Sequence, residues 1–396
     1  MNILRRLPLS RLLLLCGVIV AVGIGATALA LAIGTGPTPP PKPLPEALHD
    51  ALSSASGQQV QGVSARVQYT NHLLEGANLA SGSGKAGELA SNPLLSGATG
   101  RLWIGSEGHA RLELQSEKGD TQILYDGHNV SLYDAATNTL YRYTPPPESG
   151  SGGQAGGPGD SSSTGGSGSR ISGGFTIESA SGTGADHKVP TVAEIEEGIA
   201  RAGKHAVISG ATPTDVAGQA AYTVRVSPRE NGGLIGGAEL SWDASNGVPL
   251  RTAIYSSTSS SPVIELAATE ISYGPVESSV LDFTPPANAK VEEVTLPSRH
   301  HPASSGSSAS GSRPHVTTHG KGLESIVVLE SAVKTGKGES SESGLEGLQK
   351  VSINGVSASE LPTQLGTLLS FERAGVRYVL GGSVTPGTIE EFARGL

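Results

Sequence analysis

The clearest pattern of hydrophobic and polar positions is the stretch AELSWDASNGVPLRTAIY, residues 238–255. Leu240 and Trp242 alternate with polar residues before the Asn-Gly pair at 246–247, and Leu250 and Ile254 continue the apolar positions after it. Because Asn-Gly tolerates positive φ, this pattern predicts a β-hairpin with one apolar and one polar face.

Similar alternation predicts strands along most of the chain. Val63, Ala65, Val67 and Tyr69 share one phase, and a series of short strands follows, separated mainly by Gly-containing turns. Strands spaced so closely must form an antiparallel meander, because a parallel crossover needs a dozen or more residues. The predicted strands are 63–69, 101–104, 110–115, 121–125, 129–134, 139–143, 220–226, 238–242, 250–255, 263–269 and 271–273.

Helical patterns are fewer. Residues 46–56 are amphipathic, and Thr191 and Glu194 have capping-box spacing at the start of a second helix. Near the end, a strand at 325–329 is followed by a hairpin over 367–384 that turns at Ala374-Gly375, and a helix over 388–396.

The amino-acid composition changes along the chain and indicates folded domains separated by linkers. Only 36% of its 396 residues are hydrophobic and 55 are glycine, so much of it cannot be packed core. We predict a Pro-rich linker at 34–45, a large domain at 46–295 with a disordered Ser/Gly insertion at 148–174, a second linker at 296–320 and a small domain at 321–396. The net charge of -9 argues against a nucleic-acid partner.

Residues 12–33 form an uncharged apolar run that follows three arginines. The run is long enough to span a bilayer, and its flanking charges predict a cytoplasmic tail at 1–11 with all later residues extracytoplasmic. We interpret it as a transmembrane helix or signal anchor of a single-pass cell-membrane protein. The motif ALA at 28–30 leaves a cleaved signal as the alternative. Leu15 before Cys16 does not fit a lipoprotein signal, so this cysteine is expected inside the membrane helix.

Three segments resemble the LolA-like superfamily of lipoprotein carriers: GRLWIGSEGHARLELQSEKGDTQILYDGHNVSLYDAATNTLYRY, VAGQAAYTVRVSP and LSWDASNGVPLRTAIY. The C-terminal LLSFERAGVRYVLGGSVTPGTIEEFARGL resembles the small domain of RseB/MucB-type regulators of anti-sigma factors. These resemblances imply an α+β fold: an incomplete antiparallel β-barrel with covering helices, followed by a small C-terminal α+β domain. In the LolA-like family the barrel encloses an apolar cavity that holds acyl chains.

Strand phase then selects the side chains expected to line such a cavity. A register error of one residue would exchange lining for surface. The expected lining is Val67, Tyr69, Leu112, Leu114, Ile123, Tyr125, Leu132, Tyr222, Val224, Leu240, Trp242 and Ile254. The leading hypothesis is an extracytoplasmic, membrane-anchored protein that binds a lipid or the acyl chain of a lipoprotein without catalysis. The alternative is an RseB/MucB-like envelope-stress regulator that binds a membrane regulatory protein.

Other chemistry finds little support in the sequence. GSGKAG at 82–87 has the spacing of a dinucleotide-binding loop, but its flanks predict no strand before it and no helix after it. His300, His301, His315 and His319 fall in the second linker without an acid or cysteine at ligand spacing. No Ser-His-acid arrangement is apparent, so we expect no enzyme, metal or cofactor.

Overall fold

The structure is a computed structural model that describes residues 36–57, 60–75, 77, 93–106, 108–117, 119–144, 189–230, 233–294, 315–333 and 348–396. The predicted tail at 1–11, membrane segment at 12–33 and insertion at 148–174 lie outside these residues, as do GSGKAG, Cys16, His300 and His301. Within the described ranges, no helix is both long enough and apolar enough to cross a membrane.

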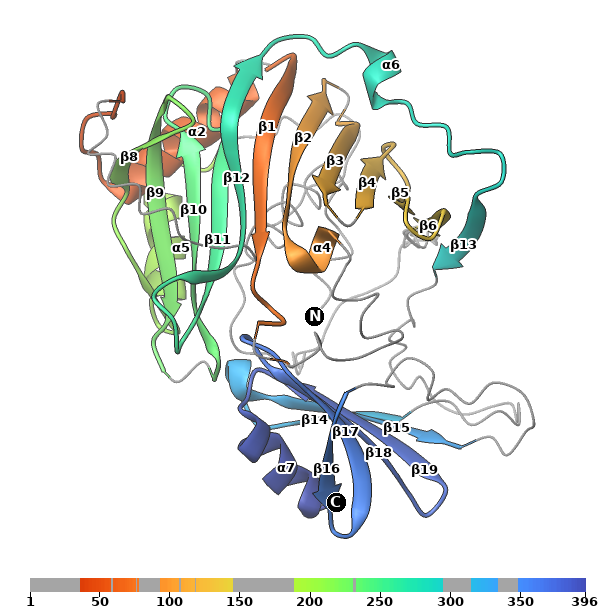
Figure 1. Ribbon diagram of the computed structural model, residues 1–396. Helices are drawn as coiled ribbons and strands as arrows, with labels where there is room; N and C mark the ends of the chain where they lie inside the picture. Colours follow the sequence, from red (N-terminus) through yellow and green to blue (C-terminus); the bar gives the residue numbers. More distant parts are fainter. Residues whose placement is uncertain are drawn as a thin grey trace, which may run out of the picture.

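The first domain is one large twisted sheet (Figure 1). Its strand order is β13-β6-β5-β4-β3-β2-β1-β12-β11-β10-β9-β7, and β8 also pairs with β9. The strands are β1 (Gly62–Asn71), β2 (Ala98–Gly105), β3 (Ala110–Ser116), β4 (Gly119–Tyr125), β5 (Val130–Asp134), β6 (Thr139–Tyr143), β7 (Ala206–Ile208), β8 (Thr212–Val216), β9 (Gln219–Pro228), β10 (Ile235–Asp243), β11 (Pro249–Ser256), β12 (Pro262–Tyr273) and β13 (Lys290–Val294).

The sheet is open, since its first and last strands do not pair with each other. It therefore has the α+β character expected, without closure into a barrel. The strands predicted at 263–269 and 271–273 are in fact the single strand β12, which pairs with β1 across a register shift between Arg66 and Val67. A bulge of this kind bends a strand without ending it.

A strap over residues 274–289, containing α6 (Ser278–Leu281), connects β12 to β13. β13 pairs with β6 in parallel, unlike the antiparallel meander before it. Arg111 of β3 holds the strap, because its guanidinium donates to the carbonyl oxygens of Val280 (2.9 Å) and Asp282 (3.1 Å). The ring of Phe283 packs on Tyr133 at 5.2 Å between centroids.

The hairpin predicted around Asn246-Gly247 is confirmed as β10 and β11. Gly247 has φ +73°, and a Cβ there would lie 2.4 Å from the carbonyl oxygen of Ala51. Ala51 belongs to α2 (Leu44–Gly57). Glycine is therefore needed twice at this turn, for its backbone conformation and for the close approach of the helix.

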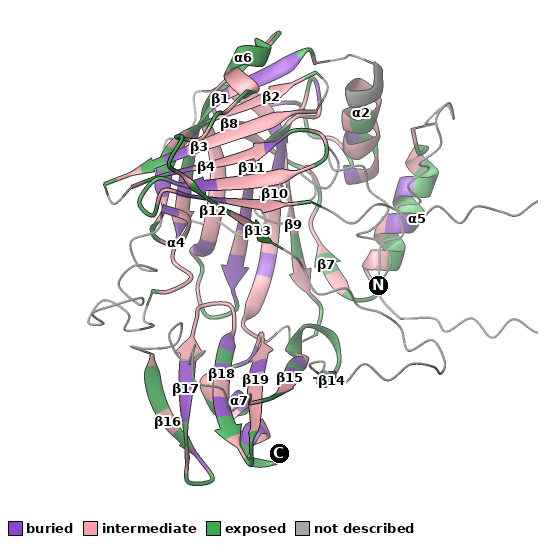
Figure 2. Ribbon diagram, turned by 90° about the vertical axis from the view of Figure 1, so that its right-hand side faces the viewer, coloured by how far each residue is buried: buried purple, intermediate pink, exposed green. Residues whose placement is uncertain are grey.

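Two helices lie side by side on one face of the sheet (Figure 2). They are α2 and α5 (Val192–Ala202), which His49 of α2 links through a 2.9 Å hydrogen bond with the carbonyl oxygen of Pro190. The predicted capping box of α5 is present: Thr191 accepts from the Glu194 amide, and the Glu194 carboxylate accepts from the Thr191 amide at 2.7 Å.

The predicted Pro-rich linker at 34–45 packs on the first domain over its described residues, 36–45, and its last two residues belong to a helix. Pro39 is buried, and the Tyr222 hydroxyl donates to the carbonyl oxygen of Pro40 at 2.7 Å. Helix α2 already begins at Leu44, which is 7% exposed. This segment packs on the domain because its prolines keep it extended along the sheet end, where Tyr222 offers a donor.

The second domain is a six-stranded sheet in the order β14-β15-β19-β18-β17-β16, with one helix packed on it. Its elements are β14 (His315–His319), η2 (Gly322–Glu324), β15 (Ile326–Ala332), β16 (Gln349–Ile353), β17 (Val356–Pro362), β18 (Thr367–Arg373), β19 (Val376–Gly382) and α7 (Pro386–Arg394). The predicted hairpin turn is confirmed, with Ala374 at φ 51° and Gly375 at φ 78°.

Part of the predicted linker at 296–320 belongs to this second sheet. Residues 315–319 form β14, which pairs with β15, and the His319 ring lies 5.0 Å from the Phe392 ring of α7. His315 lies 3.7 Å from the Glu330 carboxylate. Polar composition suggested a linker here, but the strand forms because the edge of β15 offers it hydrogen bonds.

The two domains meet through main-chain hydrogen bonds and side-chain contacts, among them a bond from the Gln364 side chain to the carbonyl oxygen of Glu75 at 3.0 Å. The amide of Leu234 donates to the carbonyl oxygen of Ser383 at 2.9 Å, and that of Gln364 donates to the carbonyl oxygen of Leu73 at 3.0 Å. Beside these bonds, Ala77 is 6% exposed and packs with Leu74, Leu348 and Leu361.

A carboxylate is buried in the second domain. Glu360 of β17 is 2% exposed and pairs with Leu369, and no described residue offers its Oε1 a hydrogen bond. Burial, and then the charge of Glu390 on α7, raise the pKa of Glu360 above its ordinary 4.5. The folded second domain therefore binds this proton more tightly than the unfolded chain does.

We predict that Glu360→Gln stabilises the second domain at neutral pH, because the amide removes a buried charge. In the wild type, stability should rise as pH falls through the raised pKa toward 4.5, since the folded state then holds more protons than the unfolded state. The variant should lose this rise. Urea unfolding of both proteins between pH 5 and 8 tests it, and an unchanged pH profile in the variant would contradict the assignment to Glu360.

Candidate functional site

Many apolar side chains of the first domain lie on one face of the sheet. From β1, Tyr69 is opposite Leu266 of β12, and the row continues through Thr252, Leu240 and Val224. Residues paired directly across antiparallel strands point to the same side. This row therefore connects β1 to β9 along one surface, which we call the inner face.

The inner face continues in the other direction. Leu102 is opposite Leu112, and the row runs on through Ile123, Leu132 and Tyr141. The pairing register puts every residue of the expected lining on the inner face: Val67, Tyr69, Leu112, Leu114, Ile123, Tyr125, Leu132, Tyr222, Val224, Leu240, Trp242 and Ile254.

At one end of the inner face these side chains form a closed core. Tyr222 and Trp242 are each 3% exposed, with ring centroids 6.1 Å apart. They pack with Val224 against Leu44 and Ala47 of α2. This part of the expected lining is therefore filled by the protein's own helices.

In the middle of the inner face, a short helix fills the space. Val67 and Leu114 are buried beside α4 (Pro93–Ser96), whose Leu94 joins their cluster. The Tyr69 hydroxyl donates to the carbonyl oxygen of Leu94 at 2.7 Å, and so does the amide of Asn71. Burial raises the pKa of Tyr69, against the hydrogen bond with Asn71 that lowers it. Tyr69 thus stays neutral and holds α4.

Beyond α4 the described inner-face side chains are less buried, although Leu102 and Leu112 still pack against the cluster beside that helix. The row Leu102, Leu112, Ile123, Leu132 and Tyr141 crosses five neighbouring strands, and each of its members is only partly buried. We call these five residues the apolar row. Tyr125 is buried beside it, with its hydroxyl bonded to the carbonyl oxygen of Gly127 at 2.7 Å. The apolar row is the candidate binding surface.

Sequence reasoning missed two members of this row. Leu102 and Tyr141 lie in the predicted strands 101–104 and 139–143, in the same phase as Leu112 and Leu132. Extending the phase rule across those two strands would have found them. Ile254, by contrast, shares the inner face but lies on β11, away from the apolar row.

The opposite face of β9–β12 carries charges that neutralise one another. Glu239 accepts from Arg225 (3.0 Å), Arg251 (2.9 Å) and the Tyr255 hydroxyl (2.6 Å), and Arg251 also donates to Glu265 at 2.6 Å. Burial raises the pKa of Glu239, but these hydrogen bonds outweigh it and lower the pKa overall. Burial and the bond to Glu239 raise the pKa of Tyr255 to about 12. Each charged group of this network has a hydrogen-bond partner within the network, which therefore braces the hairpin.

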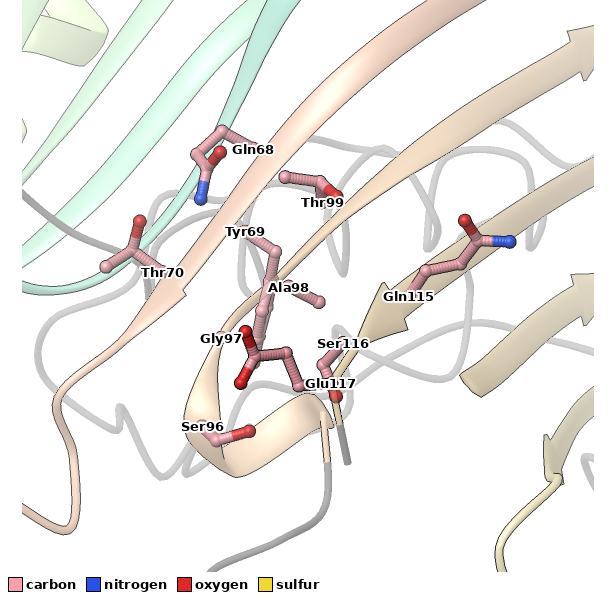
Figure 3. Close-up of a pocket in the computed structure, with 10 residues that line it drawn as sticks. All are labelled: Gln68, Tyr69, Thr70, Ser96, Gly97, Ala98, Thr99, Gln115, Ser116 and Glu117. Carbon is pink, nitrogen blue, oxygen red and sulfur yellow. The ribbon is translucent and has the colours of Figure 1, made fainter. Parts of the chain in front are cut away.

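A shallow pocket of about 510 Å³ lies where β1, β2 and β3 meet (Figure 3). Gln68, Thr99 and Gln115 are paired across these strands on the outer face, and Glu117 adds a carboxylate. The pocket is thus rimmed by amides, hydroxyls and one acid, and is separate from the apolar row. Within the described part of the chain, no group of three His, Cys, Asp or Glu residues is placed to hold a metal ion.

Comparison with solved structures finds distant likenesses. The chain is similar to MucB in complex with MucA(peri), with 14% identity and a TM-score of 0.41 over 88% of this chain and 97% of that one. The Pseudomonas aeruginosa MucA/MucB complex gives 14% identity and 0.40, over 88% and 96%. An outer membrane lipoprotein-sorting type of domain from Vibrio parahaemolyticus gives 11% and 0.21, over 60% and 95%.

Both groups that the sequence motifs resemble are represented among these structures. No protein-family model matches the chain, and no curated protein sequence matches it. At such low identity and TM-score the likeness carries no functional information, which must come from the residues of the chain itself.

The division of the inner face predicts two different mutational responses. Trp242→Ala should lower the free energy of unfolding by about 3–5 kcal/mol, because it empties a packed site under α2. Ile123→Ala should cost clearly less, because its side chain is already partly exposed. Urea unfolding of the two variants checks this, and equal losses would mean that the apolar row is packed core as well.

Proposed function

We propose that the first domain binds the acyl chain of a lipid or of a lipoprotein on the apolar row, in a protein anchored by residues 12–33 with its folded part outside the membrane. Binding is non-covalent and involves no catalytic step. The observation that carries the proposal is the partial exposure of five apolar side chains in one unbroken cross-strand row.

The dimensions and energetics of the row suit such a ligand. Five adjacent strands spaced about 4.8 Å apart give a row about 19 Å long. Each methylene that leaves water contributes about 0.8 kcal/mol, so several methylenes laid along the row give useful affinity. Soluble domains rarely leave a continuous apolar surface without a use for it.

The direct test is to purify residues 36–396 without the anchor and to examine the protein by native mass spectrometry. We expect bound lipid, or uptake of a fluorescent fatty acid. If the purified protein contains no lipid and takes up no fatty acid, the proposal of acyl-chain binding is rejected.

Two neighbouring residues of β4 provide matched variants. Ile123 lies on the inner face and Leu124 on the outer face, and both are partly buried. Ile123→Gln should weaken fatty-acid binding about tenfold or more, since losing roughly 1.5 kcal/mol of apolar burial has that effect. Leu124→Gln should bind as the wild type does. Fluorescence titration measures both, and equal weakening would indicate a stability effect rather than a lost contact.

A second candidate function is regulation through a protein partner, and the second domain favours it. Helix α7 covers one face of its sheet, while Val316 (58% exposed), Val327 (41%) and Leu368 (48%) lie on the other. Leu329 and Val379, partly buried, follow Val316 in the same cross-strand row, and Val327 and Leu368 belong to the next row. Contact with the surface of another protein would stabilise such an apolar patch more than contact with water does.

This alternative predicts a contact in cells. A photo-crosslinking residue at Leu368 should form an adduct with one membrane protein, and Val327→Asp should abolish the adduct while lipid occupancy stays unchanged. The same probe at Ser352, on the exposed edge of the domain, serves as the control. Failure to detect an adduct at Leu368, or equal adducts at both positions, would reject the regulatory function.

A further inference from the structure

The segment that leads from the predicted membrane span into the domain contacts the domain at several successive points, through close packing at Gly36 and Pro39 and through bonds at Pro40 and Lys42. Gly36 lies so close to β8 that a Cβ there would be 1.7 Å from Asp215 Oδ2. Pro39 is buried, and Pro40 accepts the 2.7 Å hydrogen bond from Tyr222. Lys42 then forms an ion pair with Asp50 of α2.

Each contact has a physical basis of its own. Because glycine has no side chain, the backbone at Gly36 can approach the Asp215 carboxylate closely. Prolines limit the backbone to an extended form, so little conformational entropy opposes the packing of residues 37–43. Tyr222 is itself fixed, since its ring belongs to the closed core with Trp242. The segment is therefore a continuation of the domain.

The connection from this segment to the apolar run is short. The run ends at Ile33, three residues before Gly36. Three residues extend by at most about 11 Å. If residues 12–33 cross the membrane, the turn between β8 and β9 must therefore stay close to the membrane surface.

The second domain lies at the other end of the molecule. In Figure 1 the first described residues, drawn in red, lie beside β8 at the upper left, whereas the second domain, drawn in blue, lies below the large sheet. The main-chain bonds at Leu234 and Gln364 fix it there. Holding β8 at the membrane thus directs the second domain away from it.

We infer that residues 36–43 form a rigid joint that holds the β8 end of the first domain against the lipid surface of the anchoring membrane. The inference has one consequence, which rests on the proposed function. The acyl chains that reach the apolar row come from the outer leaflet of that same membrane. The protein then presents or monitors lipids in place, and does not carry them across a compartment.

Site-specific labels test the joint in the full chain. Cys16 is the single cysteine, so Cys16→Ser gives a background for Ala217→Cys, in the turn after β8, and for Ser352→Cys, on β16 of the second domain. Each labelled protein is reconstituted into phosphatidylcholine nanodiscs that contain a lipid with a nitroxide on its headgroup. We expect strong quenching of the fluorophore at residue 217 and little at residue 352.

Two variants separate a rigid joint from mere proximity. A flexible Gly/Ser insertion of about 20 residues after Thr35 lies outside the packed segment, spans about 25 Å on average, and should reduce quenching at residue 217 severalfold. Gly36→Val combined with Tyr222→Phe should reduce it as well. Thr38→Val, at an exposed position of the same segment, should not.

The outcomes distinguish the joint from the proposed function. Equal quenching at residues 217 and 352, or quenching at 217 that the insertion leaves unchanged, would overturn the joint even if lipid copurifies. Strong and insertion-sensitive quenching at 217 in a protein that binds no fatty acid would support the joint and reject acyl-chain binding.

Discussion

The first domain depends on the pairing of β1 with β12. These strands are about two hundred residues apart in the chain, yet they pair from Val63 opposite Tyr273 to Asn71 opposite Ile264. This pairing joins the meander β2–β6 to the meander β9–β11, neither of which can bury its apolar face alone. Without it there would be two small sheets in place of one continuous inner face, and the apolar row would have no neighbouring core to adjoin.

Each part of the inner face has a different role, because helices cover some parts of it and leave others partly exposed. Helices α2 and α5 close one end over Trp242, and α4, held by Tyr69, closes the middle. The strap with α6 lies across the outer face, where Arg111 holds it. The apolar row is partly exposed across five neighbouring strands, and Leu240, Ile254 and Leu266 of the inner face are partly exposed as well. A single type of surface therefore serves as core in one place and as a candidate binding surface in another.

The sequence could predict which residues lie on the inner face, but not which of them are covered. Two-residue periodicity correctly assigned the inner-face residues, because pairing in register preserves phase from strand to strand. Local turn chemistry likewise gave Asn246-Gly247, Ala374-Gly375 and the capping box at Thr191. Periodicity could not say which of those residues a helix would cover, since the contact between Leu44 and Trp242 joins segments with no local relation.

The elements that were missed are mostly edge strands. β7, β8, β13 and β14 have few residues and little alternation, and they form because a neighbouring strand offers unpaired main-chain groups. The same reasoning explains the Pro-rich segment, whose composition predicts an extended conformation but not the domain surface on which it lies.

The contact between the two domains has a consequence for the history of this chain. Besides a bond from the Gln364 side chain to the Glu75 carbonyl oxygen (3.0 Å), it contains the hydrogen bonds from Leu234 to Ser383 and from Gln364 to Leu73, which join main-chain amides to main-chain carbonyls. Every residue except proline carries both groups, so substitutions on either side leave these main-chain bonds intact. An arrangement fixed in this way can persist through extensive sequence divergence, which leaves each domain free to acquire new surface residues without losing its orientation toward the other.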